Sequence, residues 1–261
     1  MPTNLLNRIV SYRVRGGLLL LLPAVVACLS LDTPSPDVDE LPSGGHHILF
    51  IGNSLTYTNN LPATVVGLAA SVGDTIRASA VALPNFALID HALGMSNAND
   101  VIKSQQWEYV ILQQGPTTVA VNRDTLILAT KMFDPLVRAS GGRIAEMMSW
   151  PTSAEPHLFN AVRASFQAAA NAVNGVFMPA GDAWRAALEA NPQIQLYGGD
   201  GYHPGPLGTY LAALVVYEKV TGHDARLLPA KAVVSGVTLS TPEETVRFLQ
   251  GIAHDAVLRY P

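Results

Sequence analysis

Several residue types and motifs are scarce or missing in this sequence, and each shortage excludes a class of protein. The 261 residues include a single cysteine, Cys28, which rules out an internal disulfide framework and a zinc site built from cysteines. The 16 Lys and Arg are outnumbered by 20 Asp and Glu. Without a basic excess to neutralise phosphates, we expect no nucleic-acid partner. No glycine-rich Walker loop and no Gly-x-Gly-x-x-Gly motif is present, so nothing supports nucleotide binding.

Histidine motifs typical of metal sites are missing as well. His46 and His47 are adjacent, but no His, Asp or Glu accompanies them at metal-ligand spacing, and no His-Glu-x-x-His occurs. We therefore expect that these two histidines are not ligands and that the protein holds no metal.

Apolar residues, by contrast, are plentiful. Hydrophobic residues make up 49% of the chain, charged residues 14%, and the mean hydropathy is +0.24. This composition excludes a disordered, collagen-like or coiled-coil protein and supplies enough apolar surface for a substantial core.

The N-terminal segment is typical of an export signal. Residues 1–27 combine a basic start with a leucine run at 18–22 that is short and ends at Pro23. The sequence Val25-Val26-Ala27-Cys28 resembles the bacterial lipobox, which predicts that Cys28 is lipidated. In the alternative interpretation, Cys28 lies incidentally beside the cleavage site of an ordinary signal peptide. Either way we expect export to the bacterial cell envelope, periplasm or exterior, with membrane attachment only through a lipid at Cys28.

A polar tether and one folded domain are predicted to follow the signal. Residues 28–45 mix Pro, Gly, Ser and acidic residues without an apolar period, which is typical of a disordered tether. The domain then covers residues 46–261, a size compatible with a single α/β unit. Loss of residues 1–27 removes three arginines and changes the formal charge from −4 to −7.

Short apolar runs alternate with segments of helical period along this domain. That alternation predicts a parallel sheet covered on both faces, in a three-layer α/β/α sandwich whose central sheet of about five strands is flavodoxin-like. The predicted strands are 47–51, 75–80, 109–112, 143–148 and 175–177. The predicted helices are 61–72, 89–93, 124–139, 156–174, 180–190, 206–221 and 242–258.

Two motifs carry candidate chemistry. Gly52-Asn53-Ser54 follows the first predicted strand, where a sharp turn can expose a serine hydroxyl and turn backbone N–H groups toward a developing oxyanion. Asp200 and His203 lie three residues apart on a loop, a spacing that lets the carboxylate orient the imidazole. Each motif alone also fits ordinary turn and cap chemistry.

Together, the two motifs and their order resemble those of the SGNH (GDSL-type) hydrolases over nearly the whole domain. The resemblance implies that Ser54 is the nucleophile, His203 the general base and Asp200 the residue that orients His203. Asn53 replaces the usual Asp of Gly-Asp-Ser, which is not one of the three triad residues. No cofactor is implied.

The two middle motifs of that family are less complete here. Asn85 stands where a glycine supplies an oxyanion-hole N–H in the family, and asparagine tolerates the left-handed conformation that such a turn needs. The Asn expected after the third strand is missing, and Gln114, Gln113 or Thr117 could donate in its place. A glutamine pair that binds strand-end backbone groups is the alternative.

Two aromatic residues are predicted to flank a substrate. Trp150 follows the fourth strand and Tyr202 lies between Asp200 and His203, so both could form a pocket wall, with core packing as the alternative for Trp150. Asp182 is expected to cap a helix.

The function predicted from these features is an exported serine esterase acting on small acyl esters, acetyl esters above all, of small molecules or carbohydrates. The alternative is a catalytically impaired module of the same fold that binds glycans.

Overall fold

The central feature of the computed structural model, which describes residues 44–261, is a parallel β-sheet. Its five strands are ordered β2-β1-β3-β4-β5, and every neighbouring pair is parallel. This order confirms the flavodoxin-like sheet, because it is the order of doubly wound proteins of that type. The strands are β1 (His46–Gly52), β2 (Ile76–Ala82), β3 (Tyr109–Leu112), β4 (Arg143–Met147) and β5 (Val176–Met178).

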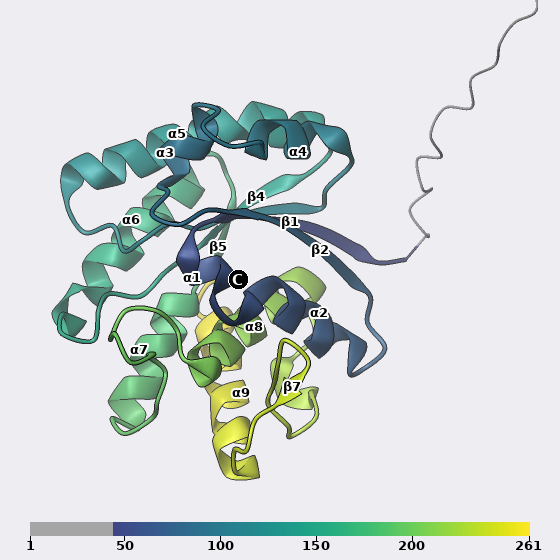
Figure 1. Ribbon diagram of the computed structural model, residues 1–261, viewed down its shortest axis with the longest axis vertical. Helices are drawn as coiled ribbons and strands as arrows, with labels where there is room; N and C mark the ends of the chain where they lie inside the picture. The colour runs from purple at the N-terminus through teal and green to yellow at the C-terminus, as the bar shows by residue number, and fades with distance from the viewer. Residues whose placement is uncertain (1–43) are drawn as a thin grey trace, which may run out of the picture. The chain divides into compact units, whose positions relative to one another are not determined.

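Helices cover both faces of the sheet (Figure 1). One face packs against α3 (Leu88–Ala92), α4 (Ala98–Ser104), α5 (Ala120–Ala139) and α6 (Phe159–Ala172). The other packs against α2 (Leu61–Ala70), α7 (Ala180–Ala190), α8 (Pro206–Thr221) and α9 (Glu243–Leu258).

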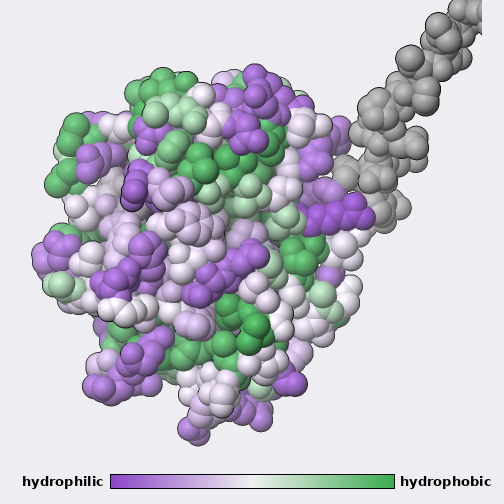
Figure 2. Space-filling view, viewed as in Figure 1, coloured by the Kyte–Doolittle hydropathy of each residue, from purple (hydrophilic) through white to green (hydrophobic). Residues whose placement is uncertain are grey.

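The core follows from the sequence pattern. The run Ile48–Ile51 is completely buried, as expected for a strand with helices on both faces. Helix α8 is apolar on all sides, and its residues Tyr210–Val216 are also completely buried, because α2, α7 and α9 pack around it. The outer surface mixes hydrophilic and hydrophobic side chains on the face shown in Figure 2.

Several short elements were not predicted. They are the four-residue α1 (Ser54–Tyr57), helix α4, two 3₁₀ turns (Thr58–Asn60 and Ala225–Leu227) and a hairpin of β6 (Val233–Val234) and β7 (Val237–Thr238). All of them are at most seven residues long, which is shorter than the window of about 11 residues over which a hydrophobic period can be recognised. Helix α5 begins at Ala120 rather than at residue 124, and the predicted helix 156–174 is a 3₁₀ turn followed by α6.

The predicted signal peptide, Cys28 and nearly all of the predicted tether lie outside the described residues. Within residues 44–261, no helix combines the length and the apolar character needed to cross a membrane.

Candidate active site

Ser54 lies at the carboxyl edge of the sheet because β1 ends at Gly52 and a single residue, Asn53, separates it from α1. Asn53 is extended and caps α1, and its Oδ1 accepts a hydrogen bond from the Leu55 N–H at 3.1 Å. Glycine suits position 52, because a Cβ there would meet Gln113 Oε1 and Thr56 Oγ1 at 2.6 Å and would push these two hydrogen-bonded side chains apart. Ser54 is therefore the first residue of a short helix whose start is rigidly fixed.

The loop between α7 and α8 brings Asp200 and His203 to the same place. Asp200 Oδ1 accepts hydrogen bonds from the backbone N–H groups of Tyr202 (3.0 Å) and His203 (2.9 Å). Gly201, with φ of 67°, makes the tight turn between them. Asp200 Oδ2 lies 2.5 Å from His203 Nδ1, and His203 Nε2 lies 2.9 Å from Ser54 Oγ. A continuous hydrogen-bonded chain thus joins residues that are 149 positions apart.

The charge distribution suits proton transfer along that chain. The hydrogen bond from His203 and those from the backbone N–H groups of Tyr202 and His203 lower the pKa of Asp200 to about 2, so the carboxylate is ionised at neutral pH. An ionised Asp200 accepts only, which places the His203 proton on Nδ1. Nε2 is then free to accept the proton of Ser54.

Two backbone N–H groups next to Ser54 are available to an oxyanion. Asn85 has φ of 61°, in the left-handed region that the sequence predicted for it. Among the described residues, neither the Asn85 N–H nor the Ser54 N–H donates to another protein group.

The side chains after β3 are held in a hydrogen-bonded frame. Gln113 Oε1 accepts from Asn53 N–H (3.2 Å) and from Thr56 Oγ1 (2.7 Å), so this residue binds strand-end backbone as the alternative interpretation held. Gln114 Oε1 accepts from Leu88 N–H at 3.1 Å, and its Nε2 donates to Thr117 Oγ1 at 2.7 Å.

The same frame distinguishes the two side-chain donor candidates. Thr117 Oγ1 donates its only proton to the Gly115 carbonyl at 3.2 Å, whereas Gln114 Nε2 keeps a second proton. The geometry therefore favours Gln114 over Thr117.

Asn53 contributes a contact that the usual aspartate would lack. Its Nδ2 donates to the Phe86 carbonyl at 3.0 Å, next to Asn85. A carboxylate at this position has no proton to give, so the asparagine links the Ser54 turn to the loop that carries Asn85.

A cleft of about 340 Å³ is lined by the neighbours of Ser54 and His203, namely Asn53 and Tyr202, and by Asn85; Ser54, Asp200 and His203 themselves are not among its lining residues. No acidic or basic side chain lines it, and Tyr202 forms part of its wall as predicted. The other lining residues are Asn53, Asn85, Phe86, Ala87, Gln114, Gly115, Pro116, Thr117, Asn122 and Thr125.

At this edge the structure favours the core-packing alternative for Trp150, and the predicted cap at Asp182 is wrong. Trp150 does not line the cleft: it is 1% exposed and stacks on Trp184 at 3.7 Å between ring centroids, and its Nε1 donates to the Tyr202 carbonyl. Through this hydrogen bond, Trp150 supports the loop that carries Asp200 and His203. Asp182 does not cap a helix, because α7 begins two residues earlier, and the buried carboxylate accepts a hydrogen bond from Tyr260 Oη at 2.6 Å.

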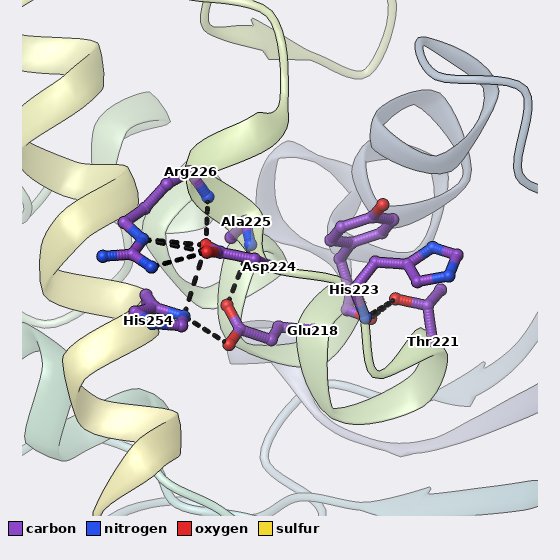
Figure 3. A network of polar contacts seen from close by, with 8 residues as sticks. Glu218, Thr221, His223, Asp224, Ala225, Arg226 and His254 are labelled. Atoms are coloured by element: carbon purple, nitrogen blue, oxygen red, sulfur yellow. Dashed lines mark hydrogen bonds and ion pairs between the residues drawn. The ribbon is translucent and has the colours of Figure 1, made fainter.

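A second cluster of charged groups lies away from the cleft, where α8, α9 and the turn between Ala225 and Leu227 meet (Figure 3). Ligand atoms of Glu218, Asp224 and His254 lie within 4.8 Å of one another, the only such group in the part of the chain that the structure describes. The Asp224 carboxylate is paired with Arg226 at 2.6 Å, and Glu218 accepts from Ala225 N–H. The positive charge of the Arg226 guanidinium would repel a bound cation, so the arrangement fits an ion-pair network.

His46, one of the two adjacent histidines discussed above, lies outside this cluster, and its Nδ1 contacts Glu108 Oε2 at 2.7 Å.

No protein-family model and no curated protein sequence matches this chain. Several solved structures do match. A DUF4886 family protein from Bacteroides uniformis is 17% identical over 82% of this chain and 95% of its own, with a TM-score of 0.67. A protein described as an SGNH hydrolase from Slackia heliotrinireducens is 22% identical over 67% and 98%, with a TM-score of 0.55.

An acetylxylan esterase from Geobacillus stearothermophilus, in the form of a catalytic mutant, is 16% identical over 68% of this chain and 95% of that one, with a TM-score of 0.55. The chain thus has the SGNH hydrolase fold, which confirms, at the level of the fold, the resemblance drawn from the Ser54 and His203 motifs.

Proposed function

We propose that this protein is a serine hydrolase that cleaves small acyl esters, acetyl esters above all, of small molecules or carbohydrates. The observation that carries the proposal is the hydrogen-bonded chain from Asp200 through His203 to Ser54. It ends on a hydroxyl at the carboxyl edge of the sheet, where open α/β folds place their ligands.

The reaction proceeds through an acyl-enzyme. Ser54 Oγ attacks the ester carbonyl carbon while His203 Nε2 takes the hydroxyl proton. The bond to the alcohol oxygen then breaks as His203 returns that proton to the leaving group. Water, deprotonated by His203, attacks the acyl-serine, releases the carboxylic acid and restores Ser54.

The negative charge on the carbonyl oxygen needs donors in both steps. The N–H groups of Ser54 and Asn85, with the second proton of Gln114 Nε2, are the donors that this chain offers there. In measured cases one such donor lowers the activation barrier by about 2.7–4 kcal/mol.

The cleft supports a small, uncharged and polar substrate. Its walls carry amides, hydroxyls and the Tyr202 ring but no charged side chain. An acetyl ester on a sugar ring matches that lining, and one protein of the same fold is an acetylxylan esterase.

The test is hydrolysis of 4-nitrophenyl acetate and of acetylated xylan by the purified protein and by Ser54→Ala. The proposal expects turnover by the wild type and a loss of about 10⁴-fold or more in the variant, as for other nucleophile deletions. If the wild type binds glycans without hydrolysing any ester, the protein is instead the non-catalytic binding module.

Export and a lipid anchor at Cys28 belong to the same proposal and rest on the sequence pattern of residues 1–28. We expect Cys28→Ala to move the protein from the membrane fraction to the soluble fraction of bacterial cells, because one thiol carries the anchor. Retention of the variant in membranes would contradict the anchor.

A further inference from the structure

His91, which the proposed reaction does not use, makes an unusual pair of contacts. It lies on α3 and is completely buried. Its Nε2 lies 2.9 Å from the carbonyl oxygen of Gly52, and its Nδ1 lies 2.7 Å from Ser96 Oγ. Gly52 is the last residue of β1, two positions before Ser54.

These contacts fix where the His91 proton resides. A carbonyl oxygen only accepts, so Nε2 carries the proton. Ser96 Oγ accepts from the Ala98 N–H at 3.2 Å, and its own proton is free to go to Nδ1. Burial lowers the pKa of His91, and the hydrogen bond to Gly52 and the charge of Asp90 oppose this effect only in part. Because the pKa is lowered, the ring is neutral at neutral pH.

The contact to Gly52 is one of three hydrogen bonds between the Ser54 turn and the segment that carries Asn85. The Leu83 N–H donates to the same Gly52 carbonyl at 3.1 Å, and Asn53 Nδ2 donates to the Phe86 carbonyl. His91 is the only one of these donors that lies on α3. His91 also packs against the Phe86 ring, with 4.9 Å between ring centroids. The loop that carries Asn85 leads directly into α3, so the position of α3 sets the position of the Asn85 N–H relative to Ser54.

We propose that His91 is a positioning residue, which uses its Nε2 proton to hold the Gly52 carbonyl and so sets the spacing between the Ser54 and Asn85 oxyanion donors. The inference rests on the proposed function. It places His91 outside the proton-transfer chain, since its ring contacts neither Ser54 nor His203.

Three variants separate this role from simple packing. His91→Gln keeps an N–H donor near the position of Nε2, whereas the shorter side chain of His91→Asn reaches only the position of Nδ1 and leaves the Gly52 carbonyl without this donor. Ser96→Ala is the matched control, because it removes the Nδ1 partner and leaves the bond to Gly52. All three are assayed with 4-nitrophenyl acetate, and thermal unfolding gives their stability.

A selective effect on kcat is expected. His91→Asn should lower kcat about tenfold or more with KM unchanged, which is less than the 10²–10³ lost when a donor is removed outright. His91→Gln and Ser96→Ala should stay within about threefold of the wild type, even where Ser96→Ala unfolds at a lower temperature. Equal loss in His91→Gln and His91→Asn, or an unchanged kcat in His91→Asn, would overturn the proposal.

A measurement on the wild-type protein covers the case in which His91→Asn does not fold. The ¹⁵N shifts of the His91 ring should show a protonated Nε2 and an unprotonated Nδ1 throughout the pH range of activity. A proton on Nδ1 with none on Nε2 would exclude the bond to Gly52. Failure of the proposed function itself looks different, since the wild type would then hydrolyse no ester at all.

Discussion

Two of the histidine–carboxylate pairs among the described residues have similar geometry and different surroundings. His203 Nδ1 lies 2.5 Å from Asp200, and His254 Nδ1 lies 2.7 Å from Glu218. The first pair is partly exposed, and its other ring nitrogen faces the Ser54 hydroxyl. The second is almost completely buried and lies 3.3 Å from another carboxylate, that of Asp224 (Figure 3). The pair alone therefore does not define a catalytic site; the hydroxyl beside it and the open cleft do.

The largest expected effect comes from Asp200→Asn. The amide keeps an oxygen for the Tyr202 and His203 N–H groups, but its NH₂ group favours the wrong tautomer of His203. We expect kcat to fall about 10⁴-fold, as for the equivalent change in serine proteases, with little change in stability because the side chain is half exposed. Ester hydrolysis and thermal unfolding measure both. A variant with normal kcat would remove Asp200 from the mechanism.

Glu218→Gln makes the same chemical change in the buried pair. It weakens a buried charge-assisted hydrogen bond, so we expect a loss of about 1–3 kcal/mol in the free energy of unfolding. The kcat of the folded variant should stay within about twofold of the wild type. Urea denaturation and the ester assay test the pair of expectations. Reduced turnover at full stability would show that the two regions are coupled.

Glu146 extends the comparison to a carboxyl group without a histidine. It lies on β4, completely buried; Thr130 Oγ1 contacts its Oε1 at 2.6 Å, while its Oε2 has no partner among the described residues. Burial raises the pKa of Glu146 to about 8, although the hydrogen bond from Thr130 acts in the opposite direction. The carboxyl group is therefore mostly neutral at pH 7.

The pH dependence of stability follows from that shift. Between the ordinary pKa and about 8 the folded state binds more protons than the unfolded state, so stability declines as pH rises through this range. Glu146→Gln cannot ionise at this position, so its stability should decline less. Its free energy of unfolding should increase by about 1–3 kcal/mol relative to that of the wild type between pH 5 and pH 8. Parallel pH slopes in urea denaturation would contradict the buried neutral acid.

The sequence was a reliable guide where a local pattern determines the structure. Buried runs such as Ile48–Ile51 defined the strands, and Gly52, Ser54, Asp200 and His203 are recognisable from their immediate neighbours. The left-handed conformation of Asn85 agrees with an expectation that came from the resemblance, in which Asn85 takes the place of a glycine, together with the tolerance of asparagine for that conformation.

Prediction failed where contacts come from distant elements. Trp150 is buried because Trp184 of α7 stacks on it, and Asp182 faces Tyr260 near the end of the chain. The role of His91 depends on a bond to Gly52 across 39 residues. None of these partners lies within a single hydrophobic period, so no local pattern could reveal them.

The most direct test of the central claim is labelling of the purified protein with a fluorophosphonate, read by intact mass and peptide mapping. Ser54→Ala, His203→Ala and Glu218→Gln are measured beside the wild type. The account predicts a single adduct on Ser54 that requires His203 and persists in Glu218→Gln. A folded wild-type protein without an adduct, or with an adduct that does not depend on His203, would contradict it.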